Sequence, residues 1–196
     1  MSVNSLWKQT AAIDMSGDDL TENIDCDALI VGAGYTGLRC ALALAEAGTD
    51  VIVVDTGDIG FGASGRNGGQ VNPMLPVRHP DDLLKAVGKK YADRMTEMSL
   101  GSADEVFSMI EKYQIQCDAR QNGWLRADHC AEARDQARAA AKAWNTVGAG
   151  FSFLDGDDVR QLTGAAGYQS AVLAPKGGAV QPLSFVRGLA LSLIHI

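Results

Sequence analysis

Several features that mark particular protein classes are scarce in this 196-residue chain. Its four cysteines form no C-x-x-C pair, which excludes a disulfide-rich secreted scaffold and favours a reduced, cytoplasmic compartment. No segment approaches the ~18 apolar residues of a membrane span, and residues 1–23 lack the apolar stretch of a secretory signal. The net charge is −7 and no run of five like charges occurs, which argues against nucleic acid or an anionic membrane as the main partner.

Signatures of metal binding and of side-chain catalysis are scarce as well. The three histidines show no ligand spacing, so no metal site is predicted. No nucleophile triad or pair of carboxylates stands out along the chain. The hydrophobic share of 46% is sufficient for a folded core, and there is no internal repeat.

The clearest predicted unit covers residues 27–55. Apolar runs at 27–33 and 51–55 predict strands, and the apolar spacing of 34–47 predicts a helix that ends before Gly48. These lengths indicate a βαβ unit with parallel strands, each buried on both faces. Cys40, inside the helix, is expected to be a small buried thiol.

The remainder predicts further helices and short strands. A loose arm is expected over 1–24. Two short strands are expected around a turn at Asn122-Gly123, and another turn at Gly177-Gly178. Helices are expected from Pro80 onward, over about 92–113, over 131–147 and 155–163, and from Pro182; the strands are 115–119, 124–127, 151–154 and 168–173. No third parallel strand follows Asp55 directly, so the middle of the chain is assigned to another domain.

A G-x-G-x-x-G turn joins the first strand to the helix. Its first glycine permits a tight turn, its second lets the backbone approach a pyrophosphate, and its third lets the helix pack closely on the strand. Asp55, 18 residues after the third glycine, can accept hydrogen bonds from a ribose. The motif predicts a dinucleotide site but does not choose between NAD and FAD, and a purely structural turn is the alternative. The predicted pyrophosphate contacts are Gly32, Gly34, Tyr35, Thr36 and Gly37.

A second glycine-rich stretch occupies residues 60–70. Its few side chains allow backbone N–H groups to approach an extended ligand. Ser64 can donate to a phosphate oxygen, and Arg66 can offset pyrophosphate charge or lie near a reactive ring; an ordinary loop arginine is the alternative. A second loop of this kind suits a resident FAD better than an exchanging NAD. The predicted cofactor contacts here are Ser64, Gly65, Arg66, Asn67, Gly68 and Gly69.

These motifs together resemble one family. The stretches GAGYTGL, LAEAG, VVD and GFGASGRNGGQ are similar to the N-terminal segment of the D-amino-acid-oxidase-like FAD-dependent oxidoreductases, most of all to the γ-glutamylputrescine oxidase group. The later stretches YQIQC, GWL and KGGAVQPL resemble the entry to the substrate domain and the return from it. The similarity runs from about residue 24 to about residue 190 and covers the first half of a family member. Family members usually end strand 2 with Glu, where this chain has Asp55.

The resemblance implies an α/β fold with a Rossmann-like FAD-binding βαβ unit and part of an α+β substrate domain, apparently truncated. Its domains would be an N-terminal arm, the first part of an FAD-binding domain with inserted helices, a partial substrate domain, and a return into the FAD domain that is cut short. Their respective limits are residues 1–24, 25–115, 116–175 and 176–196.

The resemblance also implies an activity. The enzyme would oxidise the C–N bond of a small amine or amino acid, with hydride passing to flavin N5 and O2 reoxidising the flavin to give H2O2. No catalytic residue is identified, although Arg66 and Asn67 are expected near the flavin. An NAD(P)-dependent dehydrogenase and a catalytically inactive truncated fragment are the alternatives. Because the family's later strands have no counterpart, we expect this fragment to hold FAD weakly or not at all.

Overall fold

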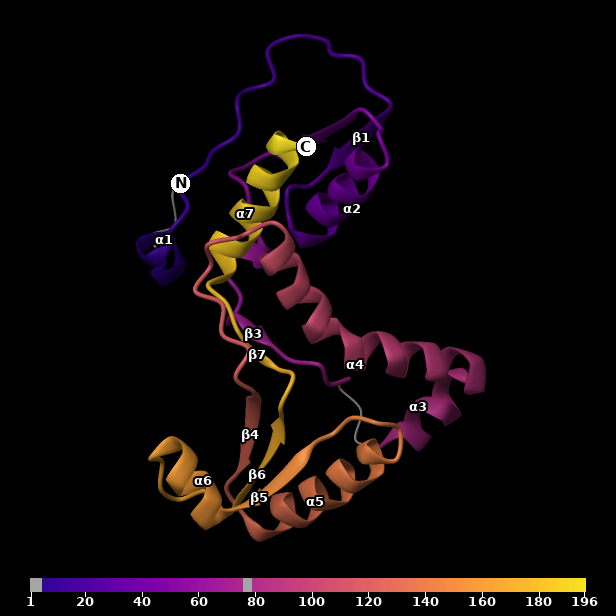
Figure 1. The fold of residues 1–196 in the computed structure, drawn as a ribbon, viewed down its shortest axis with the longest axis vertical. Helices are drawn as coiled ribbons and strands as arrows, with labels where there is room; N and C mark the ends of the chain where they lie inside the picture. Colours follow the sequence, from indigo (N-terminus) through magenta and orange to yellow (C-terminus); the bar gives the residue numbers. More distant parts are fainter. Residues whose placement is uncertain (1–4, 76–78) are drawn as a thin grey trace. The chain divides into compact units, whose positions relative to one another are not determined.

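The computed structural model describes residues 5–75 and 79–196 (Figure 1). The fold is α/β, as predicted, and the chain divides into two compact units. The first unit takes the described part of residues 1–69 together with 108–119 and 180–196, and the second takes that of 70–107 together with 120–179. Each unit is therefore assembled from separate stretches of the chain. Residues 1–4 of the predicted arm lie outside the described residues.

The first unit contains the predicted βαβ arrangement. Strand β1 (Ala28–Val31) pairs in parallel with β2 (Val51–Val54), and α2 (Tyr35–Glu46) connects them. The helix buries Leu38, Ala41 and Leu42, the side chains that its apolar spacing selects. Gly48 adopts a φ of 84° just beyond the helix, which confirms its predicted role at the C-terminus of α2.

Two burial predictions for this unit are wrong. Leu29 and Val31 of β1 are 60% and 80% exposed, so β1 is not buried on both faces. Within the described residues β1 pairs with β2 alone, and α2 covers one side of the pair. Cys40 is exposed as well, because the 3.6-residue period turns it away from the face that carries Leu38 and Leu42.

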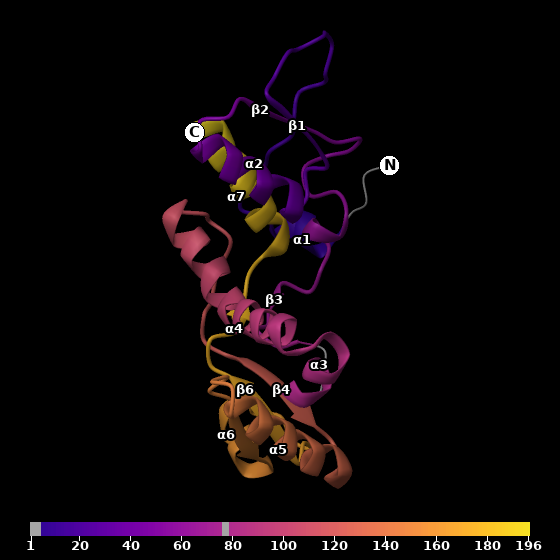
Figure 2. The same cartoon turned by 90° about the vertical axis from the view of Figure 1, so that its right-hand side faces the viewer.

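Helix α7 (Pro182–His195) packs against α2, and the two lie side by side in Figures 1 and 2. It begins at Pro182, as predicted, and the side chain of Gln181 caps it by accepting a hydrogen bond from the Ser184 backbone N–H at 2.6 Å.

The N-terminal arm is more ordered than predicted. It contains α1 (Leu6–Thr10), which the sequence pattern did not indicate. Gln181 donates to the Trp7 carbonyl at 2.7 Å, and Arg187 donates to the Ile13 carbonyl at 2.8 Å. Side chains of α7 and of the residue before it therefore hold the arm, and the expectation of a loose arm is wrong for this stretch.

The second unit is built on a three-stranded antiparallel sheet in the order β4 (Trp124–Asp128), β6 (Ser170–Ala174), β5 (Ser152–Asp155). Helices α5 (Ala131–Asn145) and α6 (Gly156–Thr163) pack on it, as Figure 1 shows. Its core includes Trp144, Phe151 and Val172. The predicted helices from Pro80 and over about 92–113 are α3 (Pro80–Val87) and α4 (Lys89–Lys112), which begins in this unit.

Two strand predictions fail in the middle of the chain. Residues 115–119 form no strand, and β4 pairs with β6 instead of forming a hairpin around Asn122-Gly123. Gly178 is not a turn residue, because it begins β7 (Gly178–Ala179), which pairs antiparallel with β3 (Gln70–Val71). Over residues 5–75 and 79–196, none of the helices has the length and apolarity needed to cross a membrane.

Candidate cofactor-binding site

The first glycine turn brings the start of α2 directly onto the end of β1. Gly32 has a φ of 113°, which favours glycine, and its N–H donates to the Val54 carbonyl at 2.7 Å. A Cβ on Gly37 would lie 2.0 Å from the Gly32 carbonyl oxygen. The third glycine of the motif therefore permits the close packing of helix on strand that its spacing predicts.

The N-terminus of α2 is suited to a phosphate. The first intrahelical hydrogen bond runs from Leu38 N–H to the Gly34 carbonyl at 3.0 Å, so three preceding N–H groups have no acceptor within the helix. Ser64 Oγ accepts a hydrogen bond from the Tyr35 N–H at 3.0 Å. The N–H groups of Thr36 and Gly37 are therefore the two that can donate to a phosphate. No acidic residue lies in the first turn, so the positive end of the helix dipole is not offset there.

Asp55 is held by the main chain around it. Its Oδ2 accepts from the Ala33 N–H at 2.7 Å, and its Oδ1 accepts from the Gly57 N–H at 3.0 Å. The hydrogen bond from Ala33, together with a weaker one from Gly57, keeps the pKa of Asp55 below its usual value against the opposing effect of desolvation. Each oxygen keeps a second lone pair, so a ribose hydroxyl can still donate to it.

The second glycine stretch packs onto the first. The Gly60 N–H donates to the Ala33 carbonyl at 3.1 Å, beside the bond from Tyr35 to Ser64. A Cβ on Gly65, in the 3₁₀ turn η1 (Ala63–Gly65), would lie 2.4 Å from the Gly60 carbonyl oxygen. Gly69 has a φ of 68°, and a Cβ there would lie 2.2 Å from a backbone carbonyl oxygen. These glycines allow the loop to fold tightly against the turn.

Asn67 closes this loop on itself. Its Nδ2 donates to the Ser64 carbonyl at 2.9 Å and to the Ala63 carbonyl at 3.2 Å, and its Oδ1 accepts from the Gly69 N–H at 2.8 Å. The amide therefore has a structural role in the loop. Its expected position near the flavin stays a prediction.

The side chain of Tyr35 connects the start of α2 with the second glycine stretch and with α7. Its position in the sequence did not predict these contacts. Its hydroxyl donates to the Pro182 carbonyl at 3.1 Å and accepts from Asn67 Nδ2 at 3.4 Å. Its ring packs on Phe185 of α7 with 5.3 Å between centroids. Burial raises the pKa of Tyr35, so the hydroxyl stays protonated as the donor in this contact.

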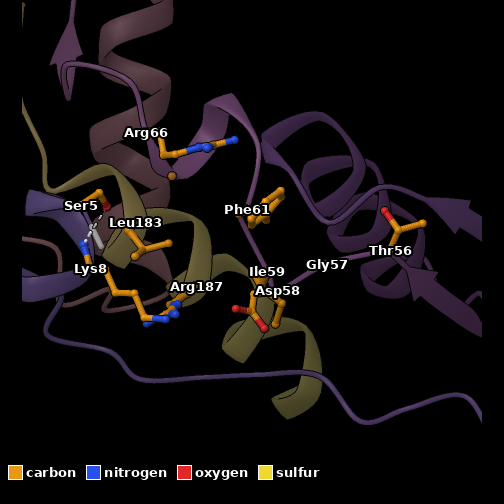
Figure 3. Close-up of a pocket in the computed structure, with 12 residues that line it drawn as sticks. Ser5, Lys8, Thr56, Gly57, Asp58, Ile59, Phe61, Arg66, Leu183 and Arg187 are labelled. Carbon is orange, nitrogen blue, oxygen red and sulfur yellow. Dashed lines mark hydrogen bonds between the residues drawn. The ribbon is translucent and has the colours of Figure 1, made fainter. Parts of the chain in front are cut away.

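Arg66 lies beside a pocket of about 330 Å³, shown in Figure 3. Its guanidinium lies 4.8 Å from the centroid of the Phe61 ring, and its Nε donates to the Gly62 carbonyl at 3.3 Å. The pocket is also lined by Lys8 and Arg187, which no motif in the sequence marks as site residues. Gly68 is exposed, with no atom within 4 Å of where its Cβ would be.

This geometry defines a dinucleotide-binding protein: a parallel βαβ unit, a glycine turn at the helix N-terminus and a carboxylate at the end of the second strand. The chain belongs to the DAO family, described as FAD dependent oxidoreductase, whose profile matches residues 27–195. FAD is the cofactor of this family. The glycine cradles and the two N–H groups of α2 fit such a ligand, so the residues present are compatible with it.

Curated relatives are similar over nearly the whole chain. Gamma-glutamylputrescine oxidoreductase of Escherichia coli is 37% identical over 177 residues, which are 88% of this chain and 40% of the relative. The probable oxidoreductase OrdL of Haemophilus influenzae is 31% identical over 196 residues, 99% of this chain and 45% of the relative. The chain thus spans less than half the length of these relatives.

Solved structures show the same fold. Glycine oxidase from Geobacillus kaustophilus aligns with a TM-score of 0.73 at 19% identity, over 86% of this chain and 44% of that one. L-Amino acid deaminase from Proteus myxofaciens aligns with a TM-score of 0.73 at 20% identity, over 95% of this chain and 40% of that one.

Proposed function

We propose that this chain supplies the first part of an oxidase that removes a hydride from the C–N bond of a small amine or amino acid. The observation that carries the proposal is the packing of the second glycine stretch onto the first, through Gly60 to Ala33 and Tyr35 to Ser64. Two adjoining backbone-lined segments suit a long, resident dinucleotide better than one that exchanges at each turnover. The similarity to gamma-glutamylputrescine oxidoreductase of Escherichia coli supports a γ-glutamyl amine as one candidate substrate.

The residues divide into three roles. The N–H groups of Thr36 and Gly37 would hold the pyrophosphate, at the start of α2 beside Gly34. The carboxylate of Asp55 would accept from the adenosine ribose. Gly68 and Arg66 would line the path toward the flavin ring, since Gly68 leaves its surroundings open. When bound, FAD would supply the hydride acceptor and the means of transferring the electrons to O2, giving H2O2.

The cofactor assignment is tested by titrating the 196-residue chain with FAD and, separately, with NADH, while following flavin or nicotinamide fluorescence. We expect binding of FAD over NADH, with low affinity. Asp55→Ala should weaken FAD binding about tenfold, because it removes a charged acceptor. Asp50→Ala, at the opposite end of β2, is the matched control and should bind as the unsubstituted chain does. Preference for NADH would overturn the assignment in favour of a dehydrogenase.

The activity is tested on the natural gene product loaded with FAD. Amines and amino acids are added in air, and H2O2 is measured with a peroxidase-coupled dye. We expect turnover with at least one primary or secondary amine. If the flavin is retained but no amine or amino acid reduces it under anaerobic conditions, the proposed reaction is wrong even though the cofactor assignment stands.

A further inference from the structure

Most of the charged side chains that line the pocket beside the second glycine stretch are positive. Three of its side chains are cationic, Lys8, Arg66 and Arg187, against one carboxylate, that of Asp58 (Figure 3). The whole chain has a net charge of −7, so this pocket is a local exception. A cluster of cations around a cavity raises the local concentration of anions.

Arg187 is buried and incompletely paired. Only 6% of the residue is exposed, and its Nη1 donates to the Ile13 carbonyl at 2.8 Å. Within residues 5–75 and 79–196, its carboxylate contact is with Asp14 at 3.4 Å, a fully exposed side chain (104%), where water and salt screen the attraction. Its Nε is buried and has no hydrogen-bond partner among the residues that the structure describes. A buried guanidinium with an unused donor is destabilising unless an acceptor joins it.

The neighbouring groups make this corner of the pocket suitable for an oxygen-bearing anion. In Figure 3, Lys8 of α1 and Arg187 of α7 extend toward one another, which places two like charges at one wall. Ser5 Oγ accepts from the Lys8 N–H at 3.3 Å, and its hydroxyl proton stays free to donate elsewhere. Arg66 attracts an anion mainly through its charge at a distance, because its Nε already donates a hydrogen bond to the Gly62 carbonyl.

We propose that Lys8 and Arg187, neither of which is among the cofactor contacts proposed above, form a binding site for a small oxyanion, a phosphate or carboxylate group. Guanidinium and ammonium groups bind either anion by charge-assisted hydrogen bonds. A pocket of about 330 Å³ exceeds the size of the bare ion, so it also admits a small molecule that carries the group. The bound anion would tie α1 to α7 and so stabilise the docked arm.

The test is isothermal titration of the 196-residue chain with inorganic phosphate and, in a second arm, with acetate, at an ionic strength held constant with chloride. Binding in the first arm alone identifies a phosphate site, and binding in the second identifies a carboxylate site. Arg187→Gln should abolish binding, and Lys8→Gln should weaken it about fivefold, because Lys8 is exposed and its charge is partly screened. Lys85→Gln, an exposed lysine of α3, is the control and should change nothing.

Three results would overturn the proposal. The first is no heat from either anion. The second is a Lys8→Gln variant that binds as tightly as the Lys85→Gln control; Lys8 is exposed, so this variant answers the question even if Arg187→Gln fails to fold. The third is loss of phosphate binding on saturation with FAD, which would assign the pocket to the cofactor. Retained binding in the presence of FAD supports a separate site.

Discussion

Replacing Gly37 by alanine tests the packing of α2 on the glycine turn. The new Cβ would lie 2.0 Å from the Gly32 carbonyl oxygen and 3.2 Å from Ile30 Cγ2. The obstacle is backbone, so α2 must shift away from β1 and its contacts must loosen. Overpacking of this kind costs about 1–3 kcal/mol, which exceeds the gain of roughly 0.5–1 kcal/mol from replacing a helical glycine. We expect a net loss of about 1 kcal/mol, or roughly 2–4 °C in Tm.

Gly101→Ala is the matched comparison, because Gly101 also lies within a helix, but apart from the neighbouring backbone of that helix no atom lies within 4 Å of the added Cβ. It should stabilise the chain by about 0.5–1 kcal/mol. Both variants are unfolded by urea and followed by circular dichroism, with FAD binding measured alongside. If Gly37→Ala is as stable as Gly101→Ala, the close contact between helix and turn does not exist in solution, and Gly37 is not needed for the packing of α2.

Three further predictions concern single side chains. Because the folded pKa of Asp55 is lowered, its stabilising effect is present above its unfolded pKa of about 3.9 and is lost as the pH falls through the folded value. The stability difference between the unsubstituted chain and Asp55→Asn should therefore be constant from pH 7 to pH 5 and shrink below about pH 4, as urea unfolding across pH would show. Asn67→Ala should cost about 1–2 kcal/mol, because two good hydrogen bonds of an exposed amide are lost; an unchanged Tm would contradict this. Burial raises the pKa of Cys117 to about 11, so iodoacetamide at pH 8 should label exposed Cys40 and spare Cys117, as mass spectrometry would reveal.

The βαβ unit could be predicted because its information is local. The apolar runs, the glycine turn and Gly48 all lie within one continuous stretch, and each predicts the secondary structure of the residues next to it. Burial of β1 was mispredicted for the opposite reason. An apolar run shows that a strand can be covered on both faces, but the exposure of Val31 depends on which elements pack against it.

Such local patterns could not predict contacts between residues that are far apart in the sequence. Gly123 has a positive φ of 97°, but this local feature does not reveal that β4 pairs with β6. Helix α1 has only five residues, too few for a periodic signal, and the bond from Gln181 to Trp7 spans 174 positions. Within the site, the glycines were found by their spacing, whereas Lys8 and Arg187 come together only through the docking of the arm on α7.

The organisation of the second glycine stretch bears on how strongly a cofactor can bind. Glycine-rich loops lose more conformational freedom on ordering than other segments, so a mobile loop would subtract that entropy from the binding free energy. Here Asn67 fixes the loop through Ser64 and Gly69, and the Tyr35 hydroxyl joins that amide to the start of α7. The loop is therefore already ordered in the folded chain, so cofactor binding does not have to order it. It follows that the ordering of this loop, in addition to direct contacts, controls cofactor affinity. Tyr35→Phe removes only the hydroxyl that joins Asn67 to Pro182, so it should weaken FAD binding.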